Sequence, residues 1–157
     1  MPEHRFDPLI EDRGPRLDDQ LCFPLYAASR LVTRLYQDSL EPLGITYPQY
    51  VVMMILWEDA PCSVKAVGER AILNSNTLTP LLKRLQQLGF IRRDRDEADE
   101  RQVLISLTES GRALERQCQC VPENLLSGFS GDVDEAAQLK QMLDRLLPVL
   151  RNQLAER

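Results

Sequence analysis

The chain has 157 residues, of which 43% are hydrophobic and 27% charged, a composition typical of one soluble domain with a core of its own. Its net charge of −5 excludes a uniformly basic nucleic-acid-binding protein. Residues 65–93, however, contain six cationic residues and one anionic residue, a net charge of +5, so one face can still attract phosphate.

The first segment, residues 1–16, is rich in proline and charge and contains no apolar run. It fits neither a signal peptide nor a transmembrane segment, and we expect a mobile tail on a cytoplasmic protein that does not meet the membrane. Residues 17–157 contain no repeat or linker, which predicts a single domain.

A long helix is predicted from Asp18 to about Leu40. At about 100° per residue, Cys22, Tyr26 and Tyr36 share one face of it. Free N–H groups near the helix start favour a thiolate, and phenols can hydrogen-bond it and lower its pKa from about 8.5. Such a thiolate attacks peroxides. On pattern alone, core packing by Cys22 and the tyrosines is the favoured interpretation, because free cysteine is usually buried.

Two shorter helices are predicted next. Thr46-Tyr-Pro-Gln49 is a capping box that opens the apolar run from Val51 to Trp57, and the run closes at Pro61. Ser63 caps a short helix over residues 64–72.

The following helix has one apolar and one polar face. Its apolar stripe is Leu78, Leu81, Leu82, Leu85 and Leu88, and its polar face is Asn76, Thr77, Thr79, Lys83, Arg84 and Gln87. Gly89 is a typical helix stop, whereas Pro80 requires either a start near Asn76 or a distorted second turn. Amides, hydroxyls and cations on one face suit base edges and phosphates, although a merely solvated face is the alternative.

A charged hairpin follows over residues 90–107, where Val103, Ile105 and Leu107 lie on one side of a predicted strand and Leu104 and Ser106 on the other. Its acidic residues, Asp94 and Asp99 among them, are expected to hold neighbouring arginines in position. Helix, helix, polar-faced helix and hairpin in this order predict a winged helix-turn-helix lobe over residues 46–107. The predicted fold class is mainly α with a small β wing.

Two helices are predicted at the C-terminal end, over residues 108–126 and 132–154, with Pro122 and Pro148 breaking or kinking them. The apolar stripe of the last helix is too wide for one small lobe to cover. We therefore expect a symmetric dimer formed by residues 17–42 and 108–157.

The four cysteines do not predict a disulfide framework in a chain without an export signal. Cys118-Gln-Cys120 offers two thiols, and the single histidine, His4, lies in the tail, so no metal site is expected. The sequence contains no phosphate loop, paired catalytic carboxylates or nucleophile–histidine pair, so neither a cofactor nor an enzyme is predicted.

Four segments resemble one family of regulators: residues 21–30, 44–50, 76–85 and 99–108. Leu21-Cys-Phe-Pro-Leu-Tyr and Gly44-Ile-Thr-Tyr-Pro-Gln-Tyr50 are similar to the organic hydroperoxide resistance regulators (OhrR), a branch of the MarR family. The resemblance implies a homodimeric repressor that leaves its operator when an organic hydroperoxide oxidises Cys22. It also implies that Tyr36 and Tyr47, from the partner subunit, hydrogen-bond Cys22 and that Tyr26 supports the pocket.

The resemblance further implies how DNA is bound. Asp99 would orient Arg101 at the wing tip toward a narrow A·T-rich minor groove in an inverted repeat. The remaining DNA-binding residues would be Ser63, Ser75, Asn76, Thr77, Thr79, Lys83, Arg84, Arg93 and Arg95.

The chain departs from the family where some members carry a second cysteine, because Ser127 stands there. Cys118 or Cys120 could resolve a Cys22 sulfenic acid, or a small thiol could cap it, or it could be overoxidised. Cys62 is expected to be inert. Two other functions stay open: a MarR-type repressor released by a small aromatic ligand without redox chemistry, and a thiol peroxidase.

Overall fold

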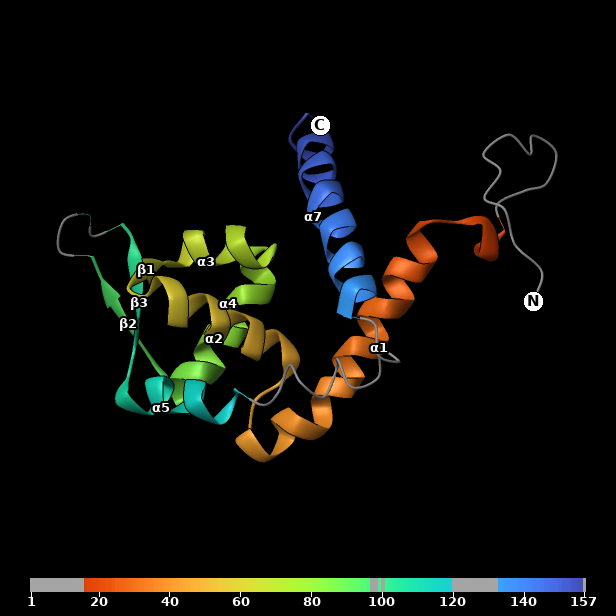
Figure 1. The fold of residues 1–157 in the computed structure, drawn as a ribbon. Helices are drawn as coiled ribbons and strands as arrows, with labels where there is room; N and C mark the ends of the chain where they lie inside the picture. The colour runs from red at the N-terminus through yellow and green to blue at the C-terminus, as the bar shows by residue number, and fades with distance from the viewer. Residues whose placement is uncertain (1–15, 97–98, 100, 120–132, 157) are drawn as a thin grey trace.

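The computed structural model describes residues 16–96, 99, 101–119 and 133–156. Its elements in chain order are η1 (Leu17–Asp19), α1 (Cys22–Leu40), η2 (Glu41–Leu43), α2 (Tyr47–Asp59), β1 (Cys62–Ser63), α3 (Val64–Ala71), α4 (Ser75–Gln87), β2 (Ile91–Arg95), β3 (Val103–Leu107), α5 (Glu109–Gln117) and α7 (Val133–Ala155). The strands and helices α2 to α5 form one lobe, from which α1 extends, while α7 lies apart from it (Figure 1). The predicted fold class is confirmed.

The first two helices of the lobe begin at the predicted caps. Gln49 Oε1 accepts a hydrogen bond of 2.8 Å from the Thr46 N–H, as a capping box requires. Ser63 Oγ accepts one of 3.1 Å from the Ala66 N–H at the start of α3. Local side-chain chemistry therefore sets both helix starts.

Helix α4 is capped by Asn74, whose Oδ1 accepts a 2.9 Å hydrogen bond from the Thr77 N–H. The helix ends before Gly89, which has a φ of +79°. Pro80 lies in the second turn and has no N–H to donate to the Asn76 carbonyl. Because Asn76 is exposed, water can bond that carbonyl, and the helix continues through the proline.

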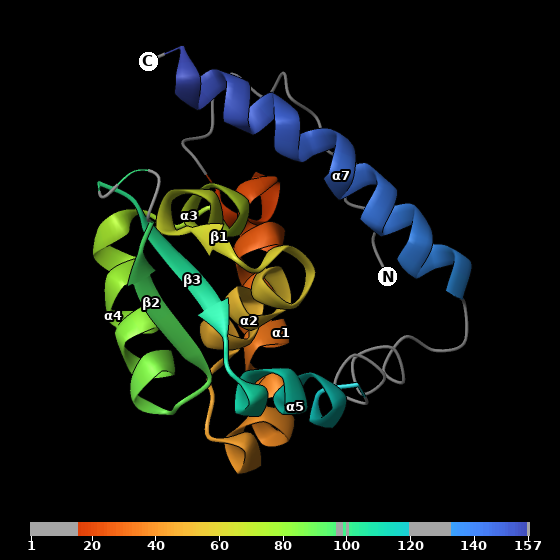
Figure 2. The same cartoon turned by 90° about the vertical axis from the view of Figure 1, so that its left-hand side faces the viewer.

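The wing is a three-stranded antiparallel sheet in the order β1-β3-β2 (Figure 2). Strands β2 and β3 pair from Ile91 with Leu107 to Arg95 with Val103. The third strand, β1, was not predicted, since two residues have no periodicity of their own and form a strand only by pairing with β3.

The lobe's core holds α4 in place. Leu78, Leu82 and Leu85 are at most 1% exposed and pack in one cluster with buried residues of α2, β2 and β3. Burial of each leucine side chain stabilises the folded state by about 1.5–3 kcal/mol. The apolar stripe thus fixes α4 to the core and leaves its polar face in solvent.

Two predicted helix boundaries are wrong. Helix α1 starts at Cys22 rather than Asp18, because extended backbone at Gln20 (φ −94°, ψ 124°) separates it from η1. Helix α5 ends at Gln117 rather than Leu126, in a tightened turn where the Cys118 N–H donates to two carbonyls. Pro148 does not break α7, which continues through it, and the exposed surface there lets water bond the freed carbonyl. Pro122 and the expected tail lie outside the described residues, except for Arg16.

Helices α1 and α7 expose apolar side chains. The exposed large residues on them are Tyr26, Leu31, Leu35, Leu139, Met142, Leu147, Val149, Leu150 and Leu154, with exposed fractions of 42–69%. Among the described residues, no helix combines the length and apolarity needed to span a bilayer.

Candidate functional site

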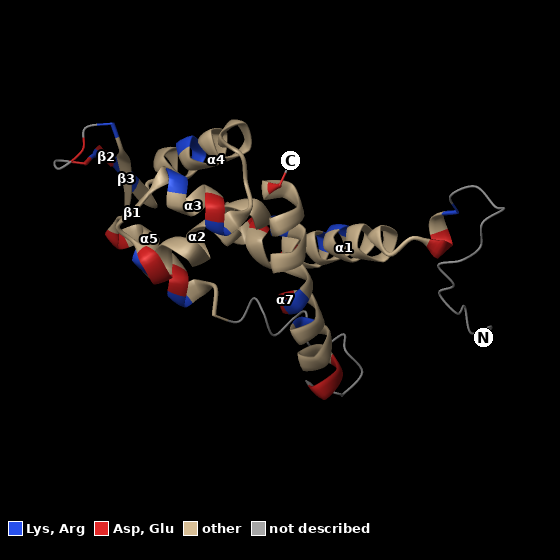
Figure 3. Ribbon diagram, turned by 90° about the horizontal axis from the view of Figure 1, so that it is seen from above, with Lys and Arg blue, Asp and Glu red and all other residues tan. Residues whose placement is uncertain are grey.

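The polar face of α4 is open to solvent. Asn76, Thr79, Lys83 and Arg84 are all exposed, and the helix carries cationic residues but no acidic ones (Figure 3). Thr77 was predicted to contact DNA, but its hydroxyl already donates a 3.0 Å hydrogen bond to Asn74 Oδ1. This face can present amides, hydroxyls and positive charge to a duplex.

A groove runs between α3, the start of α4 and the wing. It brings together four of the predicted DNA-binding residues: Ser63, Ser75, Arg93 and Arg101. Lys65, Asn74, Gln102 and Arg151 of α7 also line it, and none of these four was predicted to belong to the site. The position of Lys65, two residues after the cap Ser63 and within the cationic segment, was the signal that could have identified it.

Two arginines of the cationic segment differ in their partners. Arg70 forms ion pairs with Glu58 and Asp59, so its charge is already balanced. Arg93 is half-buried, and its buried Nε has no hydrogen-bond partner among the described residues. A buried unpaired donor is costly, because it has given up its hydrogen bond to water.

The wing tip is ordered by Asp99. Its Oδ1 accepts a 3.1 Å hydrogen bond from the Arg101 backbone N–H, and its Oδ2 accepts one of 3.1 Å from Gln102 Nε2. Asp99 therefore holds the backbone that carries Arg101, while the Arg101 side chain stays exposed. Arg95 is exposed at the end of β2.

Cys22 is the first residue of α1 and is exposed. Tyr26 follows one turn later and is 63% exposed, whereas Tyr36 is half-buried against α2. Tyr36 is 14 residues beyond Cys22, about 21 Å along the helix axis at 1.5 Å per residue. The three residues share a face, but one chain does not bring Cys22 into contact with Tyr36.

The chain does bring Tyr36 and Tyr47 together, with ring centroids 5.0 Å apart. Tyr50 lies 6.0 Å from Tyr36 and 6.0 Å from Trp57, which extends the aromatic cluster along α2. Tyr50 and Trp57 were not predicted to belong to this cluster. Their spacings of three and seven residues along one helix face were the available signal.

Burial raises the pKa of Tyr47 above 10.0, and burial together with Tyr47 raises the pKa of Tyr36. Burial is also the main cause that raises the pKa of Tyr50 to about 12. These phenols are consequently protonated, and able to donate hydrogen bonds, throughout the neutral range.

The other thiols are less accessible than Cys22. Cys118 is 3% exposed and packs in the core at the end of α5. Cys62 is half-buried in β1, where burial and then Asp59 raise its pKa against the opposing effect of Arg70. Cys120 and Ser127 lie outside the described residues. Within the described ranges, no cluster of three His, Cys, Asp or Glu residues could hold a metal ion.

Comparison with known proteins gives consistent results. A family model of the SarA/Rot transcriptional regulators matches residues 34–117. The organic hydroperoxide resistance transcriptional regulator of Bacillus subtilis is 45% identical over 148 residues, which cover 94% of this chain and 97% of that protein.

Solved structures of AbfR, a protein of Staphylococcus epidermidis, are also similar. Reduced AbfR bound to DNA is 41% identical, with a TM-score of 0.68 and coverage of 86% of this chain and 94% of that chain. Overoxidized AbfR bound to DNA is 40% identical, with a TM-score of 0.69 and coverage of 86% and 95%. The Bacillus subtilis relative and the SarA/Rot family are regulators of transcription, and AbfR is bound to DNA in two of these structures.

Proposed function

This chain belongs to the MarR-type winged-helix transcriptional regulators, in the branch of the organic hydroperoxide resistance regulators, and we propose how it senses and responds. It is a DNA-binding regulator rather than an enzyme. In our proposal it is a homodimeric repressor of the cytoplasm that binds an A·T-rich inverted repeat. An organic hydroperoxide oxidises Cys22 and thereby releases the dimer from DNA.

A dimer would complete the sensor. The observation that carries this proposal is that the exposed Cys22 thiol and the Tyr36 phenol, which contacts Tyr47 of α2, share one face of α1 about 21 Å apart along its axis. Two antiparallel copies of such a helix, crossing near its middle, place Cys22 of one subunit beside Tyr36 of the partner subunit. The exposed apolar side chains of α1 and α7 provide the surface for that association.

The chemistry of sensing is a two-electron oxidation. The Cys22 thiolate attacks the terminal oxygen of the hydroperoxide, so an S–O bond forms and the O–O bond breaks. The leaving alkoxide takes a proton and becomes an alcohol, and the sulfur becomes a sulfenic acid. Phenol donors from Tyr36 and Tyr47 of the partner subunit stabilise the thiolate before the attack.

A small cellular thiol would then cap the sulfenic acid. An S–S bond forms and the sulfenic oxygen leaves as water. Cys118 is a poor resolving residue because its thiol is buried, while Cys120 stays a candidate. Overoxidized AbfR is bound to DNA in its structure, which supports a bulky disulfide rather than a sulfinate as the released state of this chain.

DNA binding would use the exposed face of α4 and the wing. The exposed polar residues of α4 would enter the major groove, and Arg101 would reach a narrow minor groove. A symmetric dimer must present its two α4 helices about one helical turn, or roughly 34 Å, apart. A bulky group at the dimer seam would change this spacing and reduce operator affinity.

The Cys22→Ser variant tests the proposal, with Cys62→Ser as the matched control. Fluorescence anisotropy measures binding to a palindromic A·T-rich duplex in three successive conditions. These are the reduced protein, the protein treated with cumene hydroperoxide and free cysteine, and the treated protein after dithiothreitol is added. The wild type and the control should be released reversibly, while Cys22→Ser should stay bound. Normal release of Cys22→Ser would overturn the proposal, and release of that variant by a phenolic ligand would favour non-covalent sensing.

A further inference from the structure

The end of α4 and the start of α5 are joined by one side chain. Thr108, the cap of α5, donates a 2.6 Å hydrogen bond from Oγ1 to the Gly89 carbonyl, which follows α4 directly. The same oxygen accepts a 3.0 Å hydrogen bond from the Gly111 N–H. The Thr108 N–H also donates to the Phe90 carbonyl at 3.1 Å. Thr108 thus ties together two helices and the segment that enters β2.

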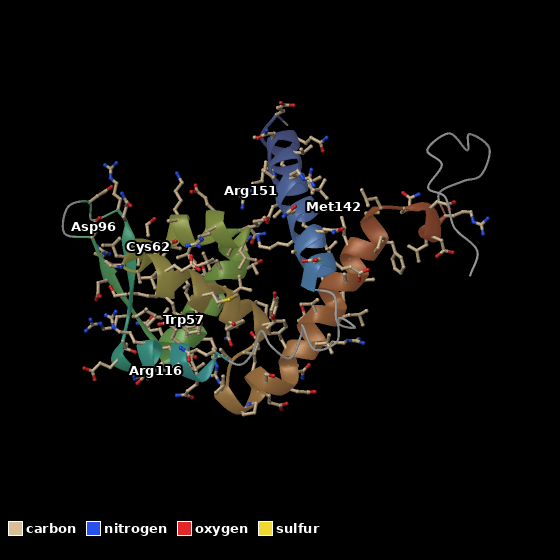
Figure 4. The ribbon with its side chains drawn as sticks, in the orientation of Figure 1. Trp57, Cys62, Asp96, Arg116, Met142 and Arg151 are labelled. Atoms are coloured by element: carbon tan, nitrogen blue, oxygen red, sulfur yellow. The ribbon has the colours of Figure 1, made fainter. Side chains whose placement is uncertain are left out.

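The start of α5 is in turn held by α2. Trp57 Nε1 donates a 2.9 Å hydrogen bond to the Gly111 carbonyl, and Trp57 lies between α2 and α5 (Figure 4). Gly111 also packs tightly, because a Cβ at this position would lie 2.1 Å from the Phe90 carbonyl oxygen. Little room is left for α5 to move relative to the base of the wing.

The other side of Trp57 meets the tyrosine cluster. Its ring is 6.0 Å from that of Tyr50, and Tyr50 is 6.0 Å from Tyr36 on α1. A continuous series of ring contacts and hydrogen bonds therefore connects α1 with the C-terminal end of α4. Tyr50, near the middle of this series, is 4% exposed, whereas the hydrogen bond from Thr108 to Gly89 at its end is exposed.

The orientation of α4 is sensitive to such an anchor. Its 13 residues span about 20 Å, so a tilt of about 5° at the C-terminal end displaces the N-terminal end by roughly 1.7 Å. Base-specific hydrogen bonds tolerate displacements of only about 0.5 Å. Phosphate attraction decays over a Debye length of about 8 Å and is much less sensitive to tilt.

We propose that Thr108 and Trp57 are positioning residues that set the angle at which α4 meets DNA and link that angle to the tyrosine cluster. The inference rests on the proposed role of α4 in reading the major groove. Neither residue is expected to touch DNA. Their loss should reduce discrimination between DNA sequences rather than overall attraction to DNA.

The test compares Thr108→Val with Thr108→Ser. Valine keeps the shape and removes both side-chain hydrogen bonds, whereas serine keeps the hydroxyl. The probes are a duplex that the wild type selects from a random-sequence library and a scrambled duplex of the same composition. Trp57→Phe, which removes the N–H donor, is measured in parallel, and thermal unfolding identifies the temperature range in which each variant is folded.

In the folded range, Thr108→Val and Trp57→Phe should lower the ratio of selected to scrambled affinity by roughly 2- to 30-fold, the usual range for residues that couple sites. Affinity for the scrambled duplex should change less than twofold, and Thr108→Ser should restore most of the ratio. Oxidation of Cys22, which mass spectrometry detects, should also reduce DNA affinity by a smaller factor in both variants than in the wild type.

An unchanged affinity ratio in folded Thr108→Val and Trp57→Phe would overturn the positioning role. An equal loss of affinity for both duplexes, or a ratio that serine does not restore, would also overturn it and indicate a merely structural contribution. Failure of the proposed function looks different, because the wild type itself would then keep its operator affinity after Cys22 is oxidised. The discrimination measured with reduced protein does not depend on that result.

Discussion

Tyr36 of α1 and Tyr47, the first residue of α2, lie with ring centroids 5.0 Å apart and ring planes inclined by 53°. The contact joins the helix that carries Cys22 to the lobe that carries α4. Both phenols are half-buried in a single chain, so part of each ring remains available to a second subunit. In the proposed mechanism, the sensing chemistry and the DNA-binding lobe would therefore meet at this pair.

Tyr36→Phe and Tyr47→Phe should slow the reaction of Cys22 with hydroperoxide. Each variant keeps the ring and removes one hydrogen-bond donor that would stabilise the reactive thiolate. Stopped-flow oxidation of Cys22 at neutral pH measures the rate. Thr33→Val, which removes a hydroxyl from the same helix, is the control. Wild-type rates in both phenylalanine variants would contradict the hydrogen-bonding role.

Tyr50 should make the protein less stable in strong alkali. Its folded pKa is about 12 against 10.0 for a free phenol, so between these values the unfolded state loses the proton first. The stabilisation is complete below pH 10 and is lost as the pH rises toward 12. Urea unfolding at pH 9, 10, 11 and 12 should show a steeper loss for the wild type than for Tyr50→Phe. Parallel pH profiles would show that Tyr50 does not contribute.

Local patterns in the sequence predicted the DNA-binding lobe well. The apolar stripe of α4, its cap Asn74 and its stop Gly89 are each set within one or two turns, and the structure contains them. Strand β1 was missed because its two residues depend on a partner about 40 positions later in the chain. The C-terminal limit of α5 was missed for a similar reason, because burial of Cys118 in the core is a tertiary feature.

The sensor site could be predicted only in part. Helical spacing correctly gave one face to Cys22, Tyr26 and Tyr36, but spacing around a helix says nothing about distance along it. The contact of Tyr36 with Tyr47 needs the turn between α1 and α2, and the proposed contact of either with Cys22 would need a second subunit. Resemblance to a family supplied that partner, whereas periodicity alone favoured simple packing.

Lys83→Ala should weaken binding to all DNA sequences about equally. Lys83 is an exposed cation on α4, and loss of one phosphate contact should reduce the slope of log affinity against log salt by about 0.9 per subunit. Anisotropy titrations from 50 to 300 mM KCl on the selected and scrambled duplexes measure this. Lys140→Ala, which removes an exposed cation from α7, is the control and should keep the wild-type slope. A sequence-dependent loss would instead place Lys83 at a base edge.

Asn76→Ala should have the opposite signature. An amide on the exposed face near the start of α4 is suited to a bidentate contact with adenine, worth about 1–3 kcal/mol of discrimination. The variant should lose affinity for the selected duplex and keep its affinity for the scrambled one. Equal binding of the selected duplex by Asn76→Ala and the wild type would remove Asn76 from the readout face.

Gly111→Ala should destabilise the fold by about 2 kcal/mol or more, because a methyl group would lie 2.1 Å from the Phe90 carbonyl oxygen, a backbone atom that cannot simply rotate away. Thermal and urea unfolding of the reduced protein measure the loss. Ser110→Ala, at the preceding exposed position on α5, is the matched control and should stay within about 0.5 kcal/mol of the wild type. A variant as stable as the wild type would mean that α5 can shift against the base of the wing.

Cys118→Ala should leave hydroperoxide-induced release intact. The Cys118 thiol is 3% exposed and packs in the core, so a sulfenic acid on exposed Cys22 can reach it only after the end of α5 opens. Maleimide should therefore modify Cys22 quickly in the folded protein and Cys118 only in denaturant. After hydroperoxide and free cysteine, mass spectrometry should find the mixed disulfide on Cys22 in both the variant and the wild type. Loss of release in Cys118→Ala, together with a Cys22–Cys118 disulfide in the wild type, would mean that oxidation opens α5 and that Cys118 is the resolving thiol.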